Sequence, residues 1–390
     1  MGYLKEYIDK NMKPNDLFAE LQNLTERYKD STGRYLYLYV AAMSKRIPGI
    51  SMEQDDFYII RDMLQNLENE KEIDVYIETP GGRGETAEEI ARFLHSKFDK
   101  VNFVISGEAK SAGTILVLSG NEVYMTETGS LGPIDAQIHI GRSIVSAYDY
   151  MDWVTMKSAD AAKSGKLNPV DATMIAQITP GELHLVNHAL EFAKDLVKEW
   201  LYLYKFNDWN ETETRHETVT EEAKRKRAEE VAKELANHSR WRTHGRSLKI
   251  DDLRDIGLRV INLDENKEVA DIIYRIQFVC KLLEESTSVY KLFFDRDEKI
   301  LKQAVAANFN NTTPLPQGKP EAVQVEIDCG KCGRKHKFYK AISENGELDK
   351  QMQAQNIHKI PEDDSYKCEC DNIIDLRSVK NELEMLLKKI

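Results

Sequence analysis

The fold is decided by two stretches of sequence, IDVYIETPGGRGETAEEIARFLHSKF at residues 73–98 and VNFVISGEAKSAGTILVLSGNEVYMT at residues 101–126. The runs IDVYIE, VNFVIS and NEVYMT are rich in β-branched and aromatic residues, which predicts strands. An amphipathic helix-like segment follows the first run, and a short apolar one follows the second. Strands separated by helices pair in parallel through crossover connections, so this region predicts an α/β core.

The whole chain has the composition of a soluble globular protein. Its 390 residues are 41% hydrophobic and 31% charged, and this length favours two or three structural units. The net charge of −12 would repel nucleic acid and an anionic membrane surface, so general binding to either is not expected. No apolar run reaches the length of a membrane span, and the N-terminus lacks the apolar region of a signal peptide. We therefore expect a cytoplasmic protein.

The rest of the chain is mainly helical by pattern. The aromatic run at 35–43 could be a strand or a buried helix. Amphipathic helices are predicted at 182–206 and 218–237, and residues 266–308 are largely helical by pattern. The expected organisation is an α/β domain with an N-terminal extension (1–262), a helical connector (263–307), a linker rich in Asn, Thr, Pro and Gly (308–322), and a small cysteine-containing domain with a C-terminal helix (323–390).

Two strand-to-helix junctions carry residues suited to chemistry. Pro80, Gly81 and Gly82 end the first strand, where glycines permit a sharp turn and leave N–H groups open to a developing oxyanion. Ser111 begins the next helix, where it could expose its Oγ beside the Ala112 N–H or could simply cap the helix. Adjacent parallel strands present their carboxyl ends side by side, where α/β active sites form. The two junctions together therefore favour a site over two ordinary turns.

Three segments resemble the serine dehydrogenase proteinase family: IETPGGRGETAEEI (77–90), AKSAGTILVLSGNEVYMTETGSLGPIDAQI (109–138) and HSRWRTHGRSLKIDDLRDIGL (238–258). That family is a branch of the Clp peptidase/crotonase superfamily and is related to signal peptide peptidase A. The resemblance implies a Clp/crotonase-type fold of parallel strands and crossover helices, and self-assembly. It also implies a serine nucleophile and an oxyanion hole, with Ser111 as the nucleophile and the backbone N–H groups of Gly81 or Gly82 and of Ala112 as donors.

The general base is open between a histidine and a lysine. Clp peptidases place their triad histidine in a region that falls here at GPIDAQI, which offers Asp135 instead. Their triad aspartate precedes the last helix of the core, where this chain has His244 in RTHGRSL. The resemblance therefore implies a Ser111–His244–Asp135 set with His and Asp exchanged in chain order. Triads are defined by geometry, so this order is allowed.

Relatives of signal peptide peptidase use a Ser-Lys dyad, whose lysine would fall here among Lys157, Lys163 and Lys166. A lysine base must be desolvated to lose its proton, and this stretch is polar, which weakens the alternative. Lys166, just ahead of a predicted helix, is preferred among the three. Lys110, next to the nucleophile, is expected to be exposed to solvent. Other histidines are expected to be ordinary surface or core residues: His139, His184 and His188.

Four of the five cysteines lie near the end of the chain, as Cys329-x-x-Cys332 and Cys368-x-Cys370. Two such pairs are typical of a tetrahedral four-thiolate zinc site, and the segment resembles zinc ribbons. Zinc could contribute on the order of 10 kcal/mol to the folding of so small a unit. Alternatives are a redox pair or free thiols, and His336 could replace one cysteine. Basic residues beside the cysteines could bind a partner or nucleic acid, although a purely structural role is equally expected.

The sequence thus predicts a soluble serine endopeptidase that hydrolyses peptide bonds through an acyl-enzyme on Ser111. Its partners would be a peptide or protein substrate and further copies of the same chain. No GxxxxGK[ST] motif is present, so any unfolding of substrates would need a separate protein. One alternative is an acyl-thioester-binding protein of the same fold, which needs no serine there. The other is a catalytically inactive Clp-fold scaffold or binding protein that acts through its zinc ribbon.

Overall fold

The computed structural model divides the chain into two compact units, Met1–Val305 and Ala306–Ile390. The predicted linker and the predicted C-terminal helix lie almost entirely outside the residues that the structure describes. Those residues are 2–45, 47, 49–140, 143–212, 215–304, 322–329, 331–332, 334–341, 346–355, 357–361, 363–377 and 380. Among them, none of the helices is both long enough and apolar enough to cross a bilayer.

A seven-stranded sheet forms the centre of the first unit, in the order β11-β10-β1-β2-β3-β5-β9. The five strands from β1 to β9 are parallel neighbours, which confirms the predicted α/β core. The aromatic run contains the strand Tyr35–Ala41, and every residue of that strand is buried. The strands are β1 (Tyr35–Ala41), β2 (Glu72–Glu78), β3 (Lys100–Ile105), β5 (Glu122–Met125), β9 (Ile261–Asn262), β10 (Val289–Phe294) and β11 (Lys299–Gln303).

The structure differs from the expected helical connector at 263–307. A short 3-10 turn (Leu263–Glu265) and α12 (Lys267–Ser286) are helical there, but β10 and β11 then form an antiparallel hairpin on the edge of β1. A long-range contact helps to hold the hairpin: the buried Nζ of Lys291 lies 2.5 Å from a carboxylate oxygen of Asp56. The first unit therefore extends through this segment, and the α/β domain does not end at residue 262.

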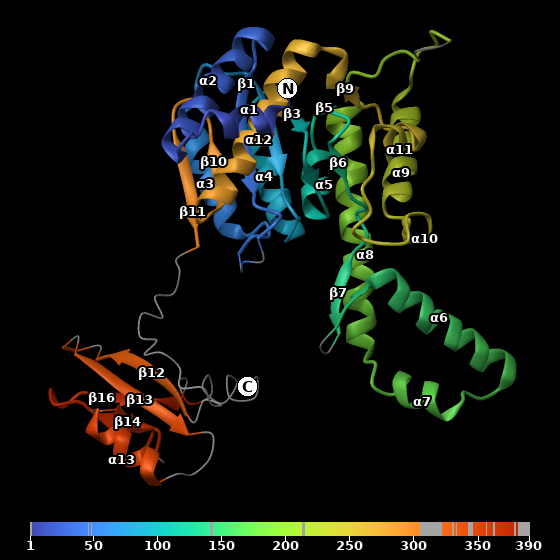
Figure 1. Ribbon diagram of the computed structural model, residues 1–390. Helices are drawn as coiled ribbons and strands as arrows, with labels where there is room; N and C mark the ends of the chain where they lie inside the picture. The colour runs from blue at the N-terminus through green and yellow to red at the C-terminus, as the bar shows by residue number, and fades with distance from the viewer. Residues whose placement is uncertain are drawn as a thin grey trace. The chain divides into compact units, whose positions relative to one another are not determined.

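Helices cover both faces of the sheet (Figure 1). On one face lie α3 (Gln54–Leu64), α4 (Gly84–Lys97), α5 (Ala112–Val117), α8 (Pro180–Trp200) and α9 (Glu221–Leu235). The other face carries α1 (Tyr3–Asp9), α2 (Pro14–Thr32) and α12. The helix predicted at 182–206 is α8 with a π-helical turn at Leu201–Lys205. Two short helices, α10 (His238–Trp241) and α11 (Ile250–Asp255), precede β9.

A second, short ladder aligns the loops at the carboxyl ends of the strands. In it β4 (Glu108–Ala109) pairs in parallel with β6 (Ser130–Leu131). Single bridges extend this pair to Thr79 on one side and to Leu248 on the other. The ladder therefore brings together the glycine loop after β2, the turn before α5 and the segment around residue 244.

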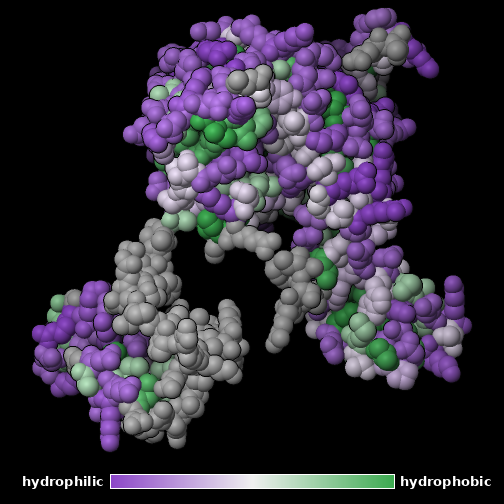
Figure 2. Space-filling model, viewed as in Figure 1, coloured by the Kyte–Doolittle hydropathy of each residue, from purple (hydrophilic) through white to green (hydrophobic). Residues whose placement is uncertain are grey.

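Within the first unit, an arm projects from the sheet and its helices after β6 (Figure 1). We define it as β7 (Gln137–Ile140), β8 (Ser143–Ser146), α6 (Ala147–Ser164), α7 (Pro169–Ile175) and the first turns of α8. Figure 2 shows apolar side chains among polar ones on its surface. Large apolar side chains that are exposed there include Met156, Val170, Met174 and Leu185.

The second unit is small and rich in strands. One sheet contains β12 (Ala322–Asp328), β13 (Lys335–Ala341) and β14 (Ile357–Lys359), and a hairpin contains β15 (Ser365–Lys367) and β16 (Ile373–Asp375). One helix, α13 (Gly346–Ala354), lies between β13 and β14 in the chain. Cysteines belong to its core, which is formed by Cys329, Phe338, Cys368, Ile374 and Leu376.

Candidate active site

Ser111 occupies the sharp turn between β4 and α5, with φ 51° and ψ −121°. A positive φ is uncommon for a residue with a side chain and persists only where the surrounding structure holds it. Its side chain makes no capping hydrogen bond to α5, although serine is among the best capping residues. The cap alternative is therefore not realised, and Ser111 instead lines a cavity.

This cavity, of about 780 Å³, brings together the residues that the sequence placed in the site. They are Ser111, Ala112, Gly81, Gly82, Asp135 and His244. The opposite wall comes from α8 and includes Leu185, Phe192 and His188. His188 was expected to be an ordinary residue, yet it faces the same space, because α8 crosses the carboxyl edge of the sheet.

The glycine loop touches the turn of Ser111 so closely that no side chain fits. Gly81 and Gly82 have φ angles of 91° and 154°, which residues with a Cβ rarely adopt. A Cβ on Gly81 would lie 2.6 Å from the Cβ of Ser111, and one on Gly82 would lie 2.3 Å from the backbone oxygen of Met52. Glycine is therefore required at both positions for the loop to reach the serine.

The backbone N–H groups of the two glycines differ in their partners. The Gly81 N–H donates to Oγ1 of Thr79 at 3.2 Å. In the parallel bridge between Met52 and Gly82, the bonds run from Met52 N–H to Gly81 O and from Arg83 N–H to Met52 O. The N–H of Gly82 itself therefore faces away from Met52. Gly82 is the better placed of the two glycines to donate to a substrate oxygen.

Asp135 and His244 meet beside this loop. The Nδ1 atom of His244 lies 2.9 Å from Oδ1 of Asp135, whose side chain is only 1% exposed. Burial by itself would raise the pKa of Asp135, but hydrogen bonds from His244 and His238 outweigh it and hold the pKa below its usual value. Asp135 is thus a carboxylate at neutral pH. It fixes His244 through Nδ1 and leaves Nε2 for a second partner in the cavity.

His238 is a member of this cluster that sequence reasoning missed. Its Nδ1 atom lies 2.8 Å from Oδ2 of Asp135, the oxygen that His244 does not use. The sequence feature that could have identified it is its position six residues before His244 in the same short segment. A single histidine in an irregular segment has no periodicity to mark it. Trp241 lies between His238 and His244 in the chain and is buried. Its indole N–H donates to the backbone oxygen of Glu234 at 2.7 Å, which holds this turn in place.

Lys110 is buried, although its place in the sequence predicts exposure to solvent. Its Nζ donates to Oγ of Ser247 at 2.9 Å, to the Leu131 oxygen at 3.1 Å and to Oγ of Ser130 at 3.2 Å. Burial lowers the pKa of Lys110 below its usual value. Because its donors are all directed at these acceptors, Lys110 fastens the segment that follows His244 to the turn that carries Ser111.

The three lysines proposed as alternative bases, Lys157, Lys163 and Lys166, lie on the arm. Lys157 pairs with Asp171 at 2.9 Å, and this hydrogen bond raises the pKa of Lys157, which disfavours the neutral amine that a base requires. Lys163 and Lys166 are exposed to solvent. The described lining of the cavity includes none of the three.

The four cysteines of the second unit form one cluster. Their sulfur atoms all lie within 4.8 Å of one another, with 3.6 Å between Cys329 and Cys370 and 3.7 Å between Cys332 and Cys368. Zinc with Zn–S bonds of about 2.3 Å would place its sulfurs about 3.8 Å apart, so the cluster fits a tetrahedral metal. His336 lies beside this cluster, with Nε2 3.2 Å from the Cys368 sulfur.

Comparison with known proteins gives a family match that contains the glycine loop and Ser111. Residues 50–162 match the family model of the ClpP-like SDH-type serine proteinases. Two uncharacterized proteins of Methanocaldococcus jannaschii are 28% identical over 196 residues and 26% identical over 203 residues. These alignments cover 49% and 52% of this chain and 54% and 56% of the relatives. The chain therefore spans about half the length of the curated relatives it matches.

Solved structures similar to this chain include two of the 1510-N membrane-bound stomatin-specific protease, both mutants, one of them in complex with a substrate peptide. They overlap 30% of this chain and 61% and 57% of their own, with 17% and 19% identity and a TM-score of 0.23. The predicted resemblance is confirmed by the family match: over residues 50–162 this chain resembles the ClpP-like SDH-type serine proteinases.

Proposed function

We propose that this chain hydrolyses peptide bonds through an acyl-enzyme on Ser111. The observation that carries the proposal is one shared cavity: Ser111 and His244 both line it, and Nδ1 of His244 is held 2.9 Å from the buried Asp135. The family match supports a serine peptidase in general terms. The substrate would be a peptide or a flexible segment of a protein.

Each residue of the cavity has a defined part in the proposed reaction. Oγ of Ser111 attacks the scissile carbonyl carbon while Nε2 of His244 takes its proton, and Asp135 stabilises the imidazolium. The N–H groups of Gly82 and Ala112 donate to the oxyanion, and one such donor contributes about 3–4 kcal/mol. His244 then protonates the leaving amine. Water, activated in turn by His244, hydrolyses the ester and restores Ser111.

A fluorophosphonate probe tests this proposal because it reacts only with an activated serine. We expect the full chain to be labelled at Ser111, and Ser111→Ala to abolish labelling. Ser96→Ala is the matched control, since Ser96 is an exposed serine that donates to the backbone oxygen of Phe93 in its own helix. Absence of labelling in folded wild-type protein would contradict the proposal and favour the inactive scaffold.

The same probe separates the two candidate bases. With histidine as base, His244→Ala should slow labelling by at least about 100-fold, whereas Lys166→Ala should leave it unchanged. The reverse result would identify the Ser-Lys alternative. Both variants are compared at equal protein concentration, after circular dichroism has shown that each is folded.

We further propose that the four-cysteine cluster binds one structural zinc ion. The spacing of its sulfurs supports this, and the reducing conditions that keep such thiols free suit the cytoplasm.

We also propose that the chain forms a homo-oligomer through the exposed apolar residues of the arm, since apolar patches on a surface mark contact sites. Sedimentation of the wild type and of a Val170→Glu, Met174→Glu variant tests that assembly.

A further inference from the structure

We propose that His238 is a positioning residue that orients Asp135 and links it to the arm. This inference rests on the proposed function, because it concerns the same Ser111–His244–Asp135 set. His238 belongs to α10 and is not among the described residues that line the cavity containing Ser111. Its contribution would be made entirely through Asp135.

The buried carboxylate of Asp135 is held from both sides. Oδ1 accepts from Nδ1 of His244 at 2.9 Å, and Oδ2 accepts from Nδ1 of His238 at 2.8 Å. A carboxylate held through only one oxygen can turn about its χ2 axis, and a buried oxygen without a donor is costly. With both oxygens engaged, the carboxylate plane is fixed, and with it the orientation of the His244 ring.

The other nitrogen of His238 faces the arm. Its Nε2 atom lies 3.2 Å from Oδ2 of Asp149, in the first turn of α6, and the ring stacks on Tyr148 with centroids 5.9 Å apart. Carboxylate oxygens accept only, so Nδ1 of His238 is the donor in the hydrogen bond to Asp135. The arm is thereby joined to Asp135 through one ring.

A charged neighbour of His238 in the chain, Arg240, makes its ion pair with another residue. Arg240, in the same short helix, pairs with Glu234 of α9 at 2.7 Å. The groups that face the ring are therefore Asp135 from the loop after β6 and Asp149 with Tyr148 from α6.

Four variants of the full chain test this inference by the rate of fluorophosphonate labelling at Ser111. His238→Ala removes both contacts, and His238→Asn keeps an amide donor for Asp135. Asp149→Ala removes only the contact to the arm and alters an exposed residue, so it carries little risk to folding. His216→Asn is the matched control, because His216 is an exposed histidine with φ 54° that pairs with Glu211, and asparagine tolerates that φ.

We expect His238→Ala to lower the maximal labelling rate about 10- to 100-fold, with little change in the half-saturating probe concentration. His238→Asn should recover most of the rate, Asp149→Ala should lose about two- to threefold, and His216→Asn should match the wild type. A folded His238→Ala variant with the wild-type labelling rate would overturn the inference.

Nuclear magnetic resonance with 15N-labelled histidine gives a readout that does not require activity. We expect the Nδ1–H resonance of His244 to shift in His238→Ala and to stay unchanged in His216→Asn. If wild-type protein is not labelled by the probe, the proposed function fails, and this resonance still decides the present inference. An unshifted His244 signal in His238→Ala would show that His238 does not position Asp135.

Discussion

The Nδ1 atom of His244 lies 2.9 Å from Oδ1 of Asp135, although 109 residues separate them in the chain. The contact follows from a bridge a few residues away, where Leu131 and Leu248 exchange backbone hydrogen bonds of 3.1 and 2.9 Å. Asp135 lies four residues beyond one end of this bridge, and His244 lies four residues before the other. The isolated bridge brings the two segments together, and the irregular segments on either side of it carry the two side chains into contact.

Asp135→Asn should slow the labelling of Ser111 about 10³- to 10⁴-fold, because an amide stabilises the wrong tautomer of His244. The fold should persist, since the amide has the size of the carboxyl group. Labelling rates of folded protein give the measurement. Asp160→Asn, at a carboxylate that is 58% exposed, is the control and should react like the wild type. An unchanged rate in Asp135→Asn would remove Asp135 from the set.

Gly82→Ala should damage the site more than the fold. A Cβ there would overlap the Met52 backbone at 2.3 Å, so the loop must move and carry its N–H away from the oxyanion position. We expect a roughly 100- to 1,000-fold loss of labelling rate, the effect of one lost oxyanion donor. Gly181→Ala is the matched control, because nothing lies within 4 Å of a Cβ at that position. Equal rates for the two variants would contradict the assigned role of Gly82.

Metal analysis of purified protein should find one zinc ion per chain. Cys368→Ser should abolish it, because Cys368 is a buried member of the cluster with its sulfur 3.7 Å from that of Cys332. Cys280→Ala should retain the zinc, since Cys280 is buried in the first unit beside Leu283. Resistance of the second unit to limited proteolysis should fall with the zinc content. Full zinc content in Cys368→Ser would refute the four-thiolate assignment.

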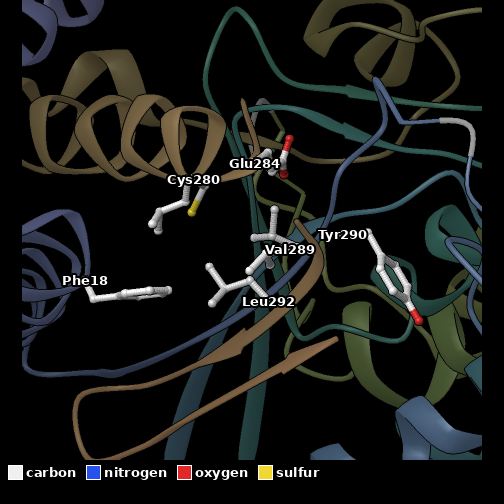
Figure 3. Close-up of a pocket in the computed structure, with 8 residues that line it drawn as sticks. Phe18, Cys280, Glu284, Val289, Tyr290 and Leu292 are labelled. Atoms are coloured by element: carbon white, nitrogen blue, oxygen red, sulfur yellow. The ribbon is translucent and has the colours of Figure 1, made fainter. Parts of the chain in front are cut away.

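Glu284→Gln should stabilise the protein at alkaline pH. Figure 3 shows Glu284 with Cys280 in a small pocket between α12 and β10. Burial, reinforced by Glu78, raises the pKa of Glu284 to about 8, and burial raises the pKa of Glu78 to about 7. Both values exceed the ordinary value of about 4.3, so the folded state binds more protons and stability falls as the pH rises from about 4 to 8.

Thermal unfolding of this variant at two pH values measures the effect. We expect the Tm of Glu284→Gln to exceed that of the wild type at about pH 8.5, where the wild-type carboxyl is ionised, with a much smaller gain at about pH 5. Glu265→Gln, at an exposed position, should show the wild-type pH dependence. An identical Tm for Glu284→Gln and wild type at both pH values would show that this carboxyl is not strained by its surroundings.

Local features of the sequence were sufficient for much of the fold. The strands β2, β3 and β5 were predicted because β-branched and aromatic runs are local signals, as are the glycine turn and the serine that starts α5. The helical pattern of α8 and α9 and the paired cysteines are local in the same sense. The strands at 289–303 were not predicted, because their pairing with β1 is a contact across about 250 residues and their own pattern is ambiguous.

The sequence by itself therefore determined which residue is offered as nucleophile and which glycines stand beside it. Only the tertiary structure decided what surrounds them: Lys110 is buried under the segment after His244, and His238 shares Asp135 with it. The physical reason is that backbone periodicity and turn chemistry are properties of neighbours in the chain. Hydrogen bonds between side chains more than 100 residues apart depend on strand register, which no local pattern contains.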